Sequence, residues 1–241
     1  MVVSIIMVVT MPGRRIDKTS DARKGSYAET TTPADSRHGN SNVIVVLRNG
    51  VEIDDPLEVV LRFLRAYGSF GPVASTAPIS FGEPDLRLAN RGGARISAAQ
   101  IAAILERRRA IEGALLSIPP GASLTRARVP WAPLGQLFDA FAGISGIGFA
   151  KMTKSLHGKR PALIPILDSV VQRHLAEDDP GAQASFGERA IGLTRGYKRD
   201  LDSNRSALGA TRLELARRGH DLTEVRILDL LIWSAEVIGL P

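Results

Sequence analysis

A Gly-Ile-Gly sequence at residues 146–148 restricts the fold more than any other feature of this chain. Glycine adopts turn conformations that other residues avoid, so two glycines around one apolar residue favour a tight hairpin. Apolar residues at helical spacing precede and follow this sequence: Leu134, Leu137, Phe138 and Phe141 before it, Met152 and Leu156 after it. The pattern predicts two helices joined by a hairpin, at about residues 134–157, with Ile144 and Ile147 filling the angle between them.

Further helices are expected wherever apolar residues recur at helical spacing behind a capping residue. Asp54-Asp55-Pro56 opens one helix, and the capping box Ser97 to Gln100 opens another that stops before Pro119. Residues 186–218 read as helix, bent near Gly196 and Gly209, and a capping box at 221–224 precedes an apolar terminal helix. Residues 43–47 and the turn at 49–50 indicate one short β element. The sequence therefore predicts an all-α, multi-helix fold with a small β element near the N-terminus.

Two regions differ in composition. Residues 11–42 are rich in Ser, Thr, Asp, Arg, Gly and Pro and contain almost no apolar residue, which indicates a disordered tail. The apolar run at 2–9 is far shorter than the roughly 20 residues that span a bilayer. A short strand, or a start codon assigned too far upstream, accounts for it. We expect a disordered tail over residues 1–42 and a single helical domain over 43–241.

Composition excludes several kinds of site. The chain has no cysteine, so disulfides, thiolate-bound zinc and cysteine-ligated iron–sulfur clusters are ruled out. Its four histidines are scattered without ligand spacing, and we expect neither a metal site nor a cofactor. No signal peptide or membrane span is recognisable, which predicts a cytoplasmic protein that does not bind a membrane. The formal net charge of +6 favours a polyanionic partner.

The hairpin is a candidate DNA-backbone clamp. Backbone N–H groups at glycines can approach a phosphate, and the helix that follows offers its positive N-terminal end. Residues 151–160 carry four Lys or Arg and no acid. Such contacts hold a protein on DNA without reading its sequence. The candidate DNA-binding residues are Gly146, Ile147, Gly148, Lys151, Lys154, Lys159 and Arg160. The alternative is an ordinary helix–helix turn with lysines on a solvated face.

The segment Leu163-Ile-Pro-Ile-Leu-Asp168 after the hairpin resembles the helix-hairpin-helix DNA glycosylase superfamily. There an aspartate, opening a helix about 20 residues after the hairpin, stabilises the cationic sugar transition state. The resemblance assigns that catalytic role to Asp168. The chain is also similar, over most of residues 55–240, to an uncharacterised bacterial domain family that is mainly actinobacterial. That similarity rests on the hairpin, Lys159-Arg160-Pro161, the segment to Val170, and the ending from Val225 to Trp233.

The chain departs from the glycosylase pattern at two positions. Bifunctional members carry a Schiff-base lysine where this chain has Ala150, so the resemblance implies at most a monofunctional hydrolase. Ser169-Val170 replaces the usual threonine–histidine pair. Asp168 also suits a helix N-cap, worth about 1 kcal/mol, and an N-cap can still face a cleft.

Two functional classes follow from the sequence. The first is a DNA-binding protein that uses the hairpin as a backbone clamp, with a DNA-glycosylase-like base-excision site or only the scaffold of one. The second is a non-enzymatic protein-interaction module of the same fold, in which the hairpin packs against a protein partner or the basic helix over 195–218 forms a homodimer. His157 is expected to meet a phosphate or the negative end of its helix, and Trp131 and Trp233 to lie in the core or an interface.

Overall fold

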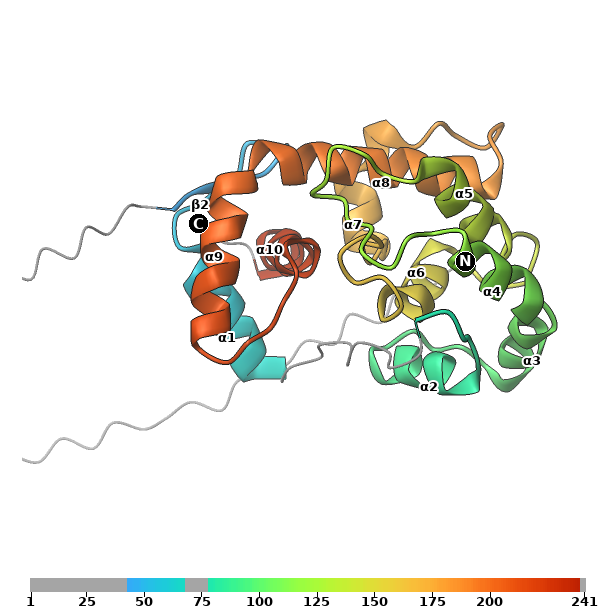
Figure 1. Cartoon of the computed structure of the whole chain (residues 1–241). Coiled ribbons are helices and arrows are strands. Elements are labelled where there is room, and N and C mark those ends of the chain that lie inside the picture. Colours follow the sequence, from blue (N-terminus) through green and yellow to red (C-terminus); the bar gives the residue numbers. More distant parts are fainter. Residues whose placement is uncertain (1–42, 68–77, 239–241) are drawn as a thin grey trace, which may run out of the picture. The chain divides into compact units, whose positions relative to one another are not determined.

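The structure is a computed structural model that describes residues 43–67 and 78–238. Ten α-helices, one short 3-10 helix and one two-stranded sheet lie in these ranges (Figure 1). The fold is therefore mostly helical with a small β element near the N-terminus, as the sequence predicts. The tail expected over residues 1–42 lies outside the described residues.

The elements follow one another along the chain as β1 (Val45–Val46), β2 (Glu52–Ile53), α1 (Pro56–Tyr67), α2 (Glu83–Arg91), α3 (Ala98–Glu106), α4 (Arg108–Leu116), α5 (Trp131–Asp139), α6 (Phe149–His157), α7 (Ser169–His174), η1 (Ala176–Asp178), α8 (Phe186–Ser203), α9 (Arg205–Arg217) and α10 (Glu224–Ile238).

Local sequence accounts for several of these boundaries. The strands pair antiparallel with Val45 opposite Ile53, around a turn in which Gly50 has a φ of 82°. Ser97 accepts a hydrogen bond from the Gln100 N–H, and the Gln100 side chain accepts one from the Ser97 N–H. This reciprocal pair is the predicted capping box, and it starts α3.

Three predicted boundaries were wrong. One helix was expected from 97 to 116, but the chain turns at Arg107, whose N–H donates to the Ile104 carbonyl at 3.0 Å. The bend expected near Gly196 and Gly209 occurs instead at Asn204, between α8 and α9. At the start of α10, the N–H of Arg226 donates to the Thr223 hydroxyl, so Thr223 caps this helix in place of the predicted Asp221.

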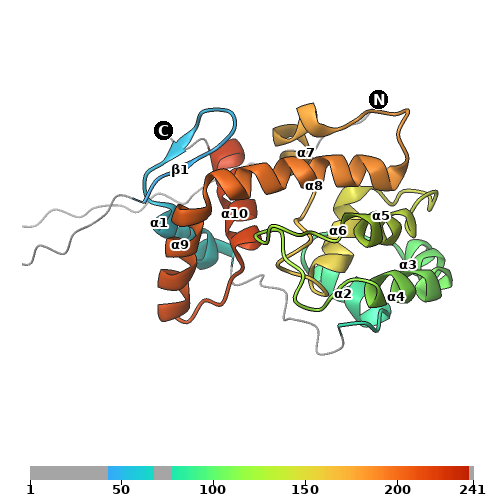
Figure 2. The ribbon, with the colours of Figure 1, turned by 45° about the horizontal axis from the view of Figure 1, so that its top comes forward.

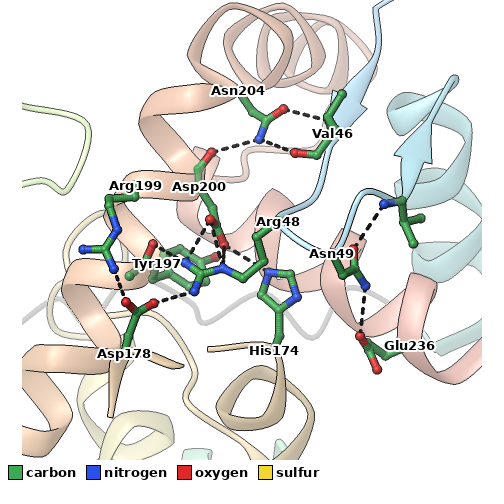
Figure 3. Close-up of polar contacts among 12 residues, drawn as sticks. Val46, Arg48, Asn49, His174, Asp178, Tyr197, Arg199, Asp200, Asn204 and Glu236 are labelled. Carbon is green, nitrogen blue, oxygen red and sulfur yellow. Dashed lines mark hydrogen bonds and ion pairs between the residues drawn. The ribbon is translucent and has the colours of Figure 1, made fainter. Parts of the chain in front are cut away.

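The break at Asn204 has a tertiary cause. Its side-chain oxygen accepts the Val46 N–H at 2.8 Å, and its side-chain nitrogen donates to the Val46 carbonyl at 2.9 Å. The same nitrogen also donates to the Asp200 carbonyl. Asn204 thus completes the hydrogen bonding of an edge strand while it separates two helices (Figure 3).

Helix pairs bury the apolar residues in a continuous core. α8 packs along α5, α2 packs against α6, and α10 contacts α1, α7 and α9 (Figures 1 and 2). Phe138 and Tyr197 are fully buried in this core. Because α2, α6, α7 and α10 all contribute residues to one cavity, this packing positions the candidate site described below.

Arg48, just after β1, ties the β element to the helices. Its guanidinium donates to Asp178 at 2.5 Å, to both carboxylate oxygens of Asp200 at 2.9–3.2 Å, and to the Gly196 carbonyl at 2.8 Å (Figure 3). His174 donates to Asp200 from the other side at 3.0 Å. Burial opposes ionisation of Asp200, but the hydrogen bonds from His174 and Arg48 hold its pKa below the ordinary value.

We expect Arg48→Met to lower the free energy of unfolding by about 3 kcal/mol, because it leaves two buried carboxylates without their shared cation. Arg65→Met is the control: Arg65 is an exposed partner of Glu58, and its loss should cost less than about 1 kcal/mol. Urea denaturation of both variants measures the difference. Equal losses would show that the Arg48 network contributes no more than a surface ion pair.

Candidate functional site

The hairpin between α5 and α6 has the geometry that a tight turn requires. Gly146 has a φ of 71°, a left-handed conformation that favours glycine. The N–H of Ile147 donates to the Ile144 carbonyl at 3.1 Å, and both isoleucine side chains are buried. Ile147 is therefore a packing residue that fixes the angle between the helices, and its side chain lies in the core rather than on the candidate DNA-binding surface.

Both hairpin glycines are exposed at the start of α6. Within the described part of the chain, the N–H groups of Gly146 and Gly148 have no hydrogen-bond acceptor. A Cβ added at Gly148 would meet nothing within 4 Å. The backbone at Gly148 is thus open to an external acceptor.

Lys151 and Lys154 extend from α6 but are held by other segments. Lys151 donates to the Gln100 side chain at 2.8 Å, and Gln100 donates in turn to the Ser145 carbonyl in the hairpin. Lys154 donates to the Gly92 carbonyl at 3.1 Å, at the end of α2. Both side chains are half-buried, so each retains one surface that a ligand can reach.

The structure contradicts the assignment of Lys159 and Arg160 to the DNA-binding surface. The Lys159 side chain is 3% exposed and pairs with Asp85 at 2.7 Å. Arg160 is buried and donates to the carbonyls of Pro78, Lys159, Leu115 and Ile118. Sequence spacing alone put both residues in one basic run with Lys151 and Lys154. The turn after α6 instead directs them inward, where they bridge α2 and the end of α4.

A cavity of about 410 Å³ lies where α2, α6, α7 and α10 meet. It combines apolar and charged walls. On the apolar side, Phe63 and Trp233 contact each other edge to face with ring centroids 5.4 Å apart. Its charged and polar lining residues are Asp85, Arg91, Lys154, Ser155, His157, Asp168, Arg226 and Asp229. The size and lining suit a small planar ligand with polar edges.

Asp168 is both the N-cap of α7 and a wall of this cavity. Its Oδ1 accepts the N–H groups of Val170 and Val171 at 3.0 and 3.1 Å. Its Oδ2 accepts no hydrogen bond from the residues that the structure describes. One carboxylate oxygen is thus used for the helix and the other remains for a ligand, so the two roles considered for Asp168 are compatible.

Lys154 stands in the cavity with Asp168. Burial lowers the pKa of Lys154, Asp168 acts to raise it, and the cations Arg226 and Arg95 lower it further. Asp168 therefore faces a mixed charged environment, because the cavity is lined by Arg91, Lys154 and Arg226 as well as by acidic residues.

His157 is the last residue of α6, so it lies at the negative end of its helix, one of the two positions that the sequence suggested. It is buried at the end of α6, and its Nδ1 donates to the Ile164 carbonyl at 2.6 Å. That carbonyl can only accept, so Nδ1 carries the proton and Nε2 presents a lone pair. Burial lowers the pKa of His157 to about 4, which keeps the ring neutral at physiological pH. Nε2 has no partner among the described residues.

Sequence reasoning missed Asp229 as a site residue, although it is an acid in the middle of the apolar helix α10. It is 3% exposed, its Oδ2 accepts the Ile166 N–H at 3.3 Å, and Arg226 lies 3.9 Å away. Burial raises the pKa of Asp229 to about 7, although Arg226 and the Ile166 N–H oppose this shift. Its Oδ1 has no partner in the described structure. The one indication in the sequence was an acid within the run Ile227-Leu-Asp-Leu-Leu231.

The basic helix over 195–218 is mostly neutralised by its neighbours. Arg212 pairs with Glu224, and Glu214 pairs with both Arg217 and Arg218. Arg195 stacks over the Trp131 ring at 5.2 Å. These contacts pair most of these cations within the chain, so the helix presents less free positive charge than its sequence suggests.

Two further features are absent from the described residues. No cluster of three or more His, Cys, Asp or Glu there is arranged to hold a metal ion. None of the helices in the described ranges is both long and apolar enough to span a membrane.

Asp229→Asn should change how stability depends on pH. Between about pH 4 and 7 the unfolded chain ionises at position 229 while the folded chain keeps its proton. The folded state then binds more protons, so the free energy of unfolding falls by up to about 4 kcal/mol as pH rises through this window. The variant lacks this loss. In urea denaturation, its free energy of unfolding should therefore rise relative to that of the parent between pH 5 and pH 8. Glu106→Gln, at an exposed site, is the control. A parent-to-variant difference that is independent of pH would contradict the raised pKa.

The comparisons with known proteins bear on the family alone. Neither the curated proteins nor the solved structures include a significant match. A family model described as a family of unknown function, DUF6308, matches residues 65–236. The match spans the helices from the end of α1 to α10, and with them the hairpin and nearly all of the cavity. The chain belongs to the family of unknown function DUF6308.

Proposed function

We propose that this protein binds DNA through the α5–α6 hairpin and receives an extruded base in the cavity beside Asp168, as a monofunctional, DNA-glycosylase-like hydrolase. The observation that carries the proposal is the position of Asp168. Sequence singled it out for its distance from the hairpin, and its free carboxylate oxygen belongs to the wall of a base-sized cavity.

One helix connects the two halves of this proposal. Gly148, whose N–H is open to an acceptor, is the N-cap of α6, and Lys154 on this helix lines the cavity. The two residues are six positions apart, which corresponds to about 9 Å along a helix axis. A phosphate at the hairpin would therefore lie about one nucleotide from the cavity. Arg91 on the cavity wall adds positive charge suited to the same backbone.

Asp168 supplies the chemistry in this proposal. Hydrolysis breaks the bond between C1′ and the base nitrogen, and the electron pair leaves with the base. Water then adds its hydroxyl to C1′ and its proton to the base. The positive charge that develops on the sugar is stabilised by a carboxylate already fixed as an N-cap, with no reorganisation. Ala150, in place of a Schiff-base lysine, fits a reaction that stops at the abasic site.

The alternative is a protein-interaction module, and one observation favours it. Lys159 and Arg160 are buried and Lys151 is bonded to Gln100, so the hairpin region offers fewer free cations than its sequence suggests. DNA affinity must then depend mainly on backbone N–H groups, and this can be tested directly.

Gly148→Ala separates the two functions. Gly148 has φ −100° and ψ −175° and room for a Cβ, so the variant should fold as well as the parent. A methyl group there would nevertheless keep a phosphate from the hairpin, and we expect roughly tenfold weaker DNA binding. Gly113→Ala, exposed in α4 with the same free space, is the matched control and should bind as the parent does.

The measurement is fluorescence anisotropy with the full chain and labelled duplexes, with and without a stable abasic analogue, at low and moderate salt. Binding that weakens as salt rises is the expected result, because neutralised phosphates release counterions. No binding by the parent chain would reject the DNA proposal and favour the protein-interaction module.

Asp168→Asn tests the chemistry. Asparagine caps a helix about as well as aspartate, so stability should change by less than about 0.5 kcal/mol, and DNA binding should be retained. Base release should fall at least roughly a hundredfold, because the neutral amide cannot stabilise the cationic sugar. The assay is alkali cleavage of abasic sites formed in duplexes that contain uracil, hypoxanthine or an alkylated purine. Salt-sensitive binding without product from any duplex would leave a DNA-binding scaffold and reject the catalytic role.

A further inference from the structure

Two residues that line the cavity each have a buried side-chain atom with no hydrogen-bond partner among the described residues, and both are held by the same short segment. His157 donates to the Ile164 carbonyl, and Asp229 accepts the Ile166 N–H. These anchor residues are two positions apart, so their Cα atoms lie at most about 7 Å from each other. The two side chains are therefore held by one three-residue stretch, and both residues line the same cavity.

Among the residues that line the cavity, the atoms without a partner in the described structure are Nε2 of His157 and Oδ1 of Asp229. Both residues are at least 97% buried and line the cavity. A buried polar atom without a hydrogen bond is costly, and proteins rarely keep one without a use. Nε2 can only accept a hydrogen bond, because the Ile164 carbonyl holds the ring proton on Nδ1. Whatever completes this site must bring a donor to His157.

The other walls of the cavity indicate the shape of the ligand that carries this donor. Phe63 and Trp233 provide aromatic surface, and Leu230 and Val171 provide aliphatic surface. A flat ligand can pack against such walls while its edge meets the polar end of the cavity.

We propose that the cavity binds a planar nitrogen heterocycle of the nucleobase class, whose ring or amino N–H donates to Nε2 of His157 and whose next polar edge atom bonds Oδ1 of Asp229. A carboxyl group serves this second role in either protonation state, since it accepts when ionised and donates when protonated. Asp168, Arg226, Tyr197 and the Ile166 N–H surround Asp229 and set which state is present. The inference deepens the proposed function, because it identifies the residues that would select an extruded base by its N–H edge.

Free bases test this without DNA. Trp131→Phe leaves Trp233, on the cavity wall, as the one tryptophan in the chain, and its fluorescence reports occupancy. Uracil and adenine, titrated to millimolar concentration into this full-length variant, should change the emission. 1,3-Dimethyluracil keeps the uracil ring and carbonyls but has no N–H, and it should bind at least roughly tenfold more weakly than uracil.

His157→Asn is the matched variant. Its side-chain nitrogen occupies the place of Nδ1 and can still donate to Ile164, while the acceptor Nε2 is lost. In the Trp131→Phe background it should weaken uracil binding at least roughly tenfold. Gly113→Ala, at an exposed position of α4 that lies outside the cavity, is the control in the same background and should leave uracil binding unchanged.

Equal binding of uracil and its dimethyl analogue would overturn the inference, and so would no response to either base. The first comparison needs no substitution at His157, so it holds even if that variant fails to fold. Base binding that depends on the N–H group, without DNA binding, would reject the proposed function and keep this site. DNA binding without a base response would reject this base site and keep the proposed DNA binding.

Discussion

The buried dipeptide Lys159-Arg160 is the constraint on which the candidate site depends. Arg160 donates to four backbone carbonyls, among them those of Leu115 and Ile118 at the end of α4, and Lys159 pairs with Asp85 on α2. A buried guanidinium is tolerated only with nearly all of its donors satisfied, so these contacts fix the end of α6 against two other helices. Fixing α6 in this way also sets the positions of the hairpin at the start of the helix and of the cavity near its end.

Burial divides the charged residues of this protein into two groups. Arg48, Asp178, Asp200 and His174 form an ion-paired network that joins the β element to α7 and α8 (Figure 3). Asp229 and His157 are as deeply buried, and each has one side-chain atom without a partner among the described residues, as His174 has at Nδ1. The first group stabilises the fold through its ion pairs. Asp229 and His157 also line the cavity, whereas His174 does not, which is why the cavity is the place to look for a ligand.

The role of the hairpin changes once its side chains are placed. Its sequence suggests a clamp of four cations, but two of them are internal supports and a third, Lys151, is bonded to Gln100. The exposed backbone at Gly146 and Gly148 remains. If the hairpin holds DNA, affinity comes from N–H groups and the end of α6 more than from lysine charge, and specificity comes from the cavity.

The sequence by itself determined what depends on near neighbours. It predicted the helical class, the short β element, the Ser97 capping box, the turn at Gly146 and the N-cap at Asp168, because caps, glycine turns and apolar periodicity act within a few residues. Only the tertiary structure decided which charges are buried. Arg160 bonds to carbonyls more than 40 residues away, Asn204 breaks a helix to pair with Val46, and Asp229 joins His157 and Asp168 around one cavity. No local pattern encodes these outcomes, since the same lysine or aspartate suits a solvated surface until distant segments enclose it.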